Sequence, residues 1–179
     1  MRWTKTKSLI ENLICGKLTK RLKVNATRYN TSLGEQRRIW ITLDNKEIFN
    51  ASSAHFLNEH DKLWDEIRNK SSKSFPECLY ECFPELIGKV SDSDYSKMIL
   101  EQRNIFNVDK VYDSLVQYSN LSIEDALNSE DIIVQSLALI DKRLGKRRLE
   151  NFKSHSDTHP LLLTFFHIRC EIEEISTPI

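Results

Sequence analysis

The spacing of apolar residues changes from helical to strand-like within the first fifty positions. The first pattern fits one side of a helix of about 3.6 residues per turn and predicts a helix over residues 5–16 that stops at Gly16. Its apolar positions are Leu9, Ile10, Leu13 and Ile14.

A period of two residues follows, as expected for strands with one buried face. Apolar and polar residues alternate over 22–26 and again over 39–43, and a third short strand begins at 48–49. Turn residues at 32–35 and 44–46 separate the strands. Three antiparallel strands with one apolar face need a cover, which the helix over residues 5–16 can supply.

Most of the remaining chain has helical periodicity. The clearest amphipathic pattern runs from Phe56 to Ile67, and residues 69–74 form the best candidate loop. Further helices are expected to begin near Pro76, Ser91, Asn107, Ser122, Ser129 and Pro160, with the one that Ser129 opens running over residues 132–144.

The predicted fold is therefore α+β. An N-terminal helix lies on a three-stranded antiparallel β-meander, and a C-terminal multi-helix bundle follows. Residues 1–70 would hold the sheet and the amphipathic helix, and residues 75–179 the all-helical region. We expect the two parts to pack as one compact unit.

Composition narrows the class of protein without identifying an activity. The 179 residues contain four Gly and four Pro, too few for a turn-rich sandwich or barrel. No apolar run approaches the roughly 18 residues of a membrane-spanning helix, and no signal-peptide core follows the basic start. The four cysteines lack disulfide or metal-finger spacing, so a reducing cytoplasm is expected.

Charge is unevenly distributed although the net charge is zero. Residues 1–38 carry ten Lys and Arg and two acids, a net charge of +8, and the rest of the chain carries −8. An asymmetry of this kind points to a charged partner, or to attraction between the two parts of the same molecule.

The basic segment contains a candidate nucleic-acid site. Arg28, Arg38 and Trp40 are expected to share the exposed face of the sheet, where bases could stack beside positive charge. Residues 1–42 would then bind nucleic acid. In the alternative interpretation, the Lys and Arg side chains are solvated or attracted by the acidic remainder of the chain, and the aromatic residues pack against the helices.

A second basic cluster closes the apolar helix over residues 132–144. Arg143, Lys146, Arg147 and Arg148 would complement the negative end of that helix. The same residues could instead clamp an anion or an acidic partner.

The densest set of possible metal ligands lies near the C-terminus. His155, Asp157 and His159 precede Pro160, and His167 and Cys170 follow. One hypothesis is a metal-dependent hydrolase at residues 155–170, with His167 on the same face as His159. The alternative is that Asp157 or His159 caps the helix that Pro160 begins. No phosphate-binding loop, nucleophile elbow or HExxH motif is present, so no cofactor is expected.

Two stretches resemble an uncharacterised family of bacterial proteins of similar length. The first is Arg-Ile-Trp-Ile-Thr-Leu-Asp-Asn-Lys-Glu-Ile-Phe at residues 38–49. The second is Asp-Lys-Arg-Leu-Gly-Lys-Arg-Arg-Leu at residues 141–149, with His159-Pro160 and Arg169-Cys-Glu171. The resemblance implies a bacterial cytoplasmic protein and carries no activity, cofactor or catalytic residue. We expect a non-enzymatic protein-binding or regulatory protein of accessory or immunity type, whose partner is another protein.

Overall fold

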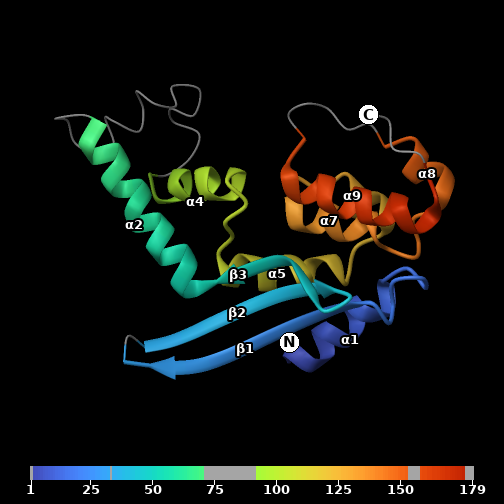
Figure 1. Cartoon of the computed structure of the whole chain (residues 1–179), viewed down its shortest axis with the longest axis horizontal. Coiled ribbons are helices and arrows are strands. Elements are labelled where there is room, and N and C mark those ends of the chain that lie inside the picture. The colour runs from blue at the N-terminus through green and yellow to red at the C-terminus, as the bar shows by residue number, and fades with distance from the viewer. Residues whose placement is uncertain (1, 33, 71–91, 153–157, 176–179) are drawn as a thin grey trace.

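The computed structural model describes residues 2–32, 34–70, 92–152 and 158–175, and it confirms the predicted α+β fold (Figure 1). Within these residues the first half of the chain forms α1 (Trp3–Leu13), β1 (Leu22–Thr31), β2 (Gly34–Leu43), β3 (Lys46–Ser52) and α2 (Ser53–Lys70). The second half forms α4 (Asp92–Gln102), α5 (Val108–Tyr118), α6 (Ile123–Leu127), α7 (Ile132–Leu139), α8 (Lys146–Glu150) and α9 (Pro160–Glu173). Among the described residues, no helix is long and apolar enough to cross a membrane.

The three strands form one antiparallel sheet in the order β1-β2-β3. The turn between β2 and β3 places Asp44 and Asn45 at φ values of 50° and 66°, the left-handed region that a two-residue hairpin turn demands. Short polar side chains tolerate this region better than most residues. The predicted meander is therefore fixed by local turn chemistry.

The first hairpin is longer than its apolar alternation indicates. β1 and β2 each contain ten residues and stay paired as far as Thr31 and Gly34. The added pairs, such as Arg28 with Arg37, are polar. Hydrophobic alternation marks only the half of the hairpin that the helices cover.

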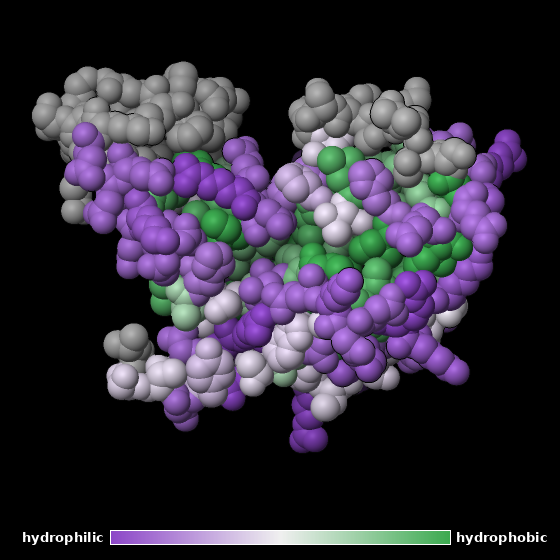
Figure 2. Space-filling view, viewed as in Figure 1, coloured by the Kyte–Doolittle hydropathy of each residue, from purple (hydrophilic) through white to green (hydrophobic). Residues whose placement is uncertain are grey.

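The inner face of the sheet forms one wall of the core. Val24, Ile41 and Phe49 are buried there, side by side across the strands. Helices α1 and α5 contact this sheet, and α7 and α9 pack on each other farther from it (Figure 1). We call the opposite side the open face; its position Trp40 is half-buried, and Figure 2 shows polar surface along the strands.

The end of α7 differs from the sequence prediction. A helix over residues 132–144 is wrong, because α7 ends at Leu139 and Asp141 instead forms an antiparallel bridge with Ile14. The Cys15 N–H donates to the Ile140 carbonyl at 2.9 Å, and the Lys142 N–H donates to the Leu13 carbonyl at 2.8 Å. Tertiary hydrogen bonds thus replace the last turn of the expected helix.

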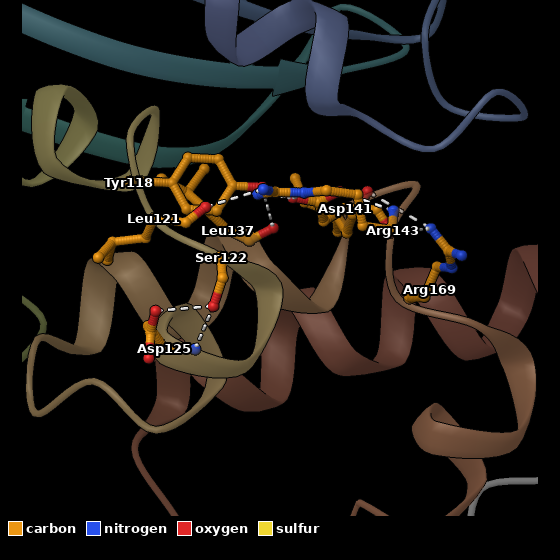
Figure 3. A network of polar contacts seen from close by, with 9 residues as sticks. Tyr118, Leu121, Ser122, Asp125, Leu137, Asp141, Arg143 and Arg169 are labelled. Carbon is orange, nitrogen blue, oxygen red and sulfur yellow. Dashed lines mark hydrogen bonds and ion pairs between the residues drawn. The ribbon is translucent and has the colours of Figure 1, made fainter.

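A buried carboxylate lies at this bridge (Figure 3). Asp141 is fully buried and accepts hydrogen bonds from the Tyr118 hydroxyl and from Arg143, whose Nη2 lies 2.6 Å from Oδ2. The Arg143 backbone N–H adds a bond of 2.7 Å to Oδ1, and Arg143 Nη1 donates to the Leu121 carbonyl at 2.8 Å. A buried charge is tolerated only when it is paired and hydrogen-bonded in this way.

Arg169 of α9 supports the same turn from the other side. It is 4% exposed and donates to the carbonyls of Asp141 at 3.3 Å and Leu144 at 3.0 Å. Its Nε lies 3.3 Å from a Glu173 oxygen without hydrogen-bond geometry, so that contact is an ion pair only. The 139–145 segment is therefore held by side chains from α5 and α9.

Removing Arg143 should destabilise the fold strongly. Arg143→Ala leaves the Asp141 carboxylate buried without its cation, a change that typically costs about 3–5 kcal/mol. Arg148→Ala is the matched control, because Arg148 belongs to an exposed pair with Glu124 and should cost far less. Urea unfolding measures both losses; equal losses in the two variants would contradict the role of the buried pair.

Tyr118 should make the fold sensitive to alkali. Burial, and secondarily the hydrogen bond to Asp141, raise the pKa of Tyr118 far above its ordinary value. The unfolded chain releases this proton near pH 10 while the folded chain keeps it, so stability falls as pH rises above about 10. In Tyr118→Phe this contribution is absent, so the stability gap between wild type and variant should narrow by up to ~1.4 kcal/mol per pH unit there. Parallel curves of unfolding free energy against pH would contradict it.

Candidate functional site

A surface groove of about 330 Å³ lies where α1, α5 and the β1–β2 hairpin meet. We call it the Trp3–Tyr112 groove. Its lining residues come from all four elements and are Trp3, Ala26, Thr27, Arg28, Arg37, Arg38, Ile39, Val108 and Tyr112.

Two aromatic side chains form one side of the groove. The ring centroids of Trp3 and Tyr112 are 6.3 Å apart, with an interplanar angle of 36°, which is a normal aromatic contact. Trp3 begins α1, and Tyr112 lies one turn into α5, whose start is fixed by the Asn107 side chain accepting from the Asp109 N–H at 2.8 Å. The cap of α5 therefore helps to position Tyr112.

On the hairpin side of the groove, Arg28 and Arg37 each have an acidic partner. Arg28 forms a close ion pair with Glu35, and Arg37 forms a two-pronged pair with Asp109. Because Asp109 is in the first turn of α5, the positive end of the helix also favours its charge. The Arg37–Asp109 pair joins the hairpin to α5.

The structure separates the residues of the predicted nucleic-acid face. Arg28 pairs with Arg37 across the strands, whereas Arg38 pairs with Thr27, so Arg28 lies on the inner side and Arg38 and Trp40 on the open face. The expectation that all three share one face is wrong. Arg38 lies opposite Thr27, the neighbour of Arg28, and neighbouring residues of a strand point to opposite faces.

On the open face, Arg38 is held by its neighbours. Its Nε donates to Asn50 at 2.9 Å, its Nη2 pairs closely with Glu47, and its guanidinium lies 4.9 Å from the Trp40 ring centroid. A phosphate bound here would compete with the Glu47 carboxylate for Arg38.

Intramolecular pairing accounts for much of the basic N-terminal segment. Six of its ten bases have a carboxylate within 4.0 Å: Lys7, Lys17, Arg21, Arg28, Arg37 and Arg38. Within the described part of the chain, the other four have no such partner, and they are Arg2, Lys5, Lys20 and Lys23. The hydrogen bond from Arg21 lowers the pKa of Asp44, as expected for a carboxylate that stays ionised beside a base.

The second basic cluster is largely engaged in internal contacts. Arg143 clamps the Asp141 carboxylate, Lys146 Nζ donates to the Glu173 carbonyl at 3.1 Å, and Arg148 pairs with Glu124 at 2.6 Å. Arg147 is exposed in the last turn of α8. The anion that Arg143 holds is thus part of the protein itself.

The predicted metal ligands do not converge among the described residues. His155 and Asp157 lie outside the described residues, and His159 caps α9, its Nδ1 accepting from the Leu161 N–H at 3.1 Å. Its Nε2 lies 2.7 Å from the Glu101 carbonyl and therefore donates, so both ring nitrogens are engaged. His167 is exposed while Cys170 is fully buried. No three His, Cys, Asp or Glu side chains in the described ranges could hold a metal ion together.

Sequence reasoning missed Trp3, Arg37 and Tyr112 as site residues. Thr31 pairs with Gly34, and counting back along both strands from that pair places Arg37 opposite Arg28. No sequence pattern predicts the contact between Trp3 and Tyr112, because the two helices that carry them are far apart in the sequence, with all three strands between them.

The chain belongs to the SF0329 protein family, whose model matches residues 2–170. This agrees with the resemblance to an uncharacterised family. No curated protein and no solved structure matches the chain.

Proposed function

We propose that this member of the SF0329 protein family is a non-enzymatic, regulatory protein of accessory or immunity type that binds another protein through the Trp3–Tyr112 groove. The observation that carries the proposal is the composition of the groove. Trp, Tyr and Arg are the residue types that dominate the binding energy of protein interfaces, and here they surround a floor that includes Ile39 and Val108.

The groove is also held in place before a partner arrives. Arg37 is fixed by Asp109, and Trp3 contacts Tyr112, so the side chains that would contact a partner keep much of their geometry. A preformed site loses less conformational entropy on binding.

The charges favour a protein partner over nucleic acid. Arg28 and Arg38, which would have to bind phosphates, are paired with Glu35 and Glu47. Each phosphate contact would leave a displaced carboxylate near the nucleic-acid backbone, which costs part of the electrostatic gain.

We also propose a cytoplasmic location. Cys15 and Cys170 are buried free thiols, and burial raises the pKa of Cys170, which keeps it in its unreactive thiol form. Free thiols of this kind are typical of a reducing compartment.

A native pull-down with two aromatic variants tests the proposed site. Wild-type protein should retain a specific partner from a lysate of the organism that makes it. Tyr112→Ala should retain at least about tenfold less of that partner, because it removes one wall of the groove. Trp40→Ala on the open face is the matched control and should retain the partner.

The contrary results are distinct. A partner that Tyr112→Ala retains and Trp40→Ala loses would move the site to the open face. Retention on single-stranded DNA that falls steeply with salt and is lost in Arg28→Ala/Arg38→Ala would replace protein binding with nucleic-acid binding.

A further inference from the structure

The outer edge of β1 has no neighbouring strand among the described residues. Among the residues that the structure describes, β1 pairs only with β2, and in Figure 1 it forms the lower edge of the sheet, with its last residues extending to the left past α1. An edge strand presents a row of backbone N–H and C=O groups that another extended segment can pair with.

The hydrogen bonds of β1 show which residues face outward. The Leu22 N–H donates to the Leu18 carbonyl at 2.8 Å, and the Val24 N–H donates to the Glu11 carboxylate at 3.4 Å, both away from β2. Since alternate residues of a strand direct their N–H to the same side, Ala26, Arg28 and Asn30 also face outward.

Protection of this edge stops halfway along the strand. The loop before β1 and the Glu11 side chain satisfy its first two outward N–H groups. Within the described ranges, no group accepts from the N–H of Ala26, Arg28 or Asn30. These three donors lie roughly 6.7 Å apart along the strand, the repeat that an added strand would match.

The open half of the edge adjoins the Trp3–Tyr112 groove. Ala26 and Arg28 belong to both, since their side chains line the groove and their backbone faces outward. In a strand added here, every second side chain would point to the same side as the groove.

Charge identifies the kind of segment. β1 contains Lys23 and Arg28 and no acid, but Arg28 is already paired with Glu35. The bases without a carboxylate partner within the described part of the chain are Lys23 in β1, Lys20 just before β1, Lys5 in α1 and Arg2 just before α1. A second copy of the chain would bring a second strand with the same two bases and no acid alongside the first. Like charges side by side oppose that pairing, whereas an acidic segment is attracted.

We propose that an acidic, extended segment of a partner protein adds to β1 as a fourth strand beside Ala26, Arg28 and Asn30, with alternate side chains at the Trp3–Tyr112 groove. The inference rests on the proposed function and specifies its partner. Main-chain hydrogen bonds would provide affinity, and the groove and the unpaired bases would provide selectivity.

Labelled peptides test the proposal without altering the protein. The probe is fluorescein-labelled (Glu-Val)4, with (Lys-Val)4 as the charge control. The acidic peptide should bind at least about tenfold more tightly than the basic one, by an amount that falls with salt. Equal binding of the two peptides would overturn the acidic preference.

Two N-methylated forms of the acidic peptide then test strand addition. Methyl groups on all Glu nitrogens or on all Val nitrogens block opposite edges of the peptide, and only one edge can face β1. One methylated peptide should therefore lose at least about tenfold in affinity, and the other should bind nearly as well as the parent. Equal affinities of the two methylated peptides would overturn strand addition.

A protein variant separates this inference from the proposed function. Ala26→Pro removes one outward N–H, and proline is tolerated on such an edge. Circular dichroism checks its fold, and the peptide experiment stands if the variant does not fold. A folded Ala26→Pro that binds (Glu-Val)4 as wild type does would overturn strand addition. Were Tyr112→Ala still to lose the native partner, the proposed function would stand.

Discussion

The buried carboxylate of Asp141 is the contact on which the geometry of the molecule depends. It is fully buried, and its partners Tyr118 and Arg143 come from the end of α5 and from the turn after α7. The backbone at Asp141 is bridged to Ile14, just after α1. The side chain of Asp141 therefore ties the end of α5 to the turn after α7 (Figure 3), and the backbone on either side of it ties the same turn to the end of α1. Trp3 at the start of α1 and Tyr112 one turn into α5 contact each other in the groove, so the two helices that the groove joins are also the two that meet at Asp141.

Much of the fold could be predicted from the sequence because its causes are local. The change from a helical period to a period of two located α1 and the three strands, and Asn107 and Ser122 accept the hydrogen bonds that their capping positions predict. The end of α7 could not be predicted, because the spacing of apolar residues over 132–144 stays helical, and only the fold shows that Ile14 offers a backbone partner. The second basic cluster at residues 143–148 looked like one charged surface, yet Arg143 forms its ion pair with Asp141, only two residues away.

The candidate site was predicted less well than the fold. The basic N-terminal segment was located, but the pairing of Arg28 with Arg37 follows from the register set by the Thr31–Gly34 pair, and a shift of one residue reverses which side chains share a face. The aromatic wall depends on a contact between α1 and α5 that no local pattern encodes. Folding also neutralises part of the +8 charge of residues 1–38, since acids from the rest of the chain, such as Asp109 and Glu173, form ion pairs with its Lys and Arg side chains. The remaining positive charge lies at α1 and around the start of β1, on the segments that precede the open half of the edge in the chain.

Amide hydrogen exchange of the free protein, followed by NMR, tests the central claim most directly. The account predicts alternation along the outer half of β1: the amides of Ala26, Arg28 and Asn30 exchange fast, while those of Thr27 and Tyr29, which face β2, are protected. The Cys15 amide, bonded to Ile140 at the Asp141 bridge, should be among the protected ones. Strong protection of Ala26, Arg28 and Asn30 in the free protein would mean that this edge is already occupied, and would contradict its role as the place where a partner strand adds.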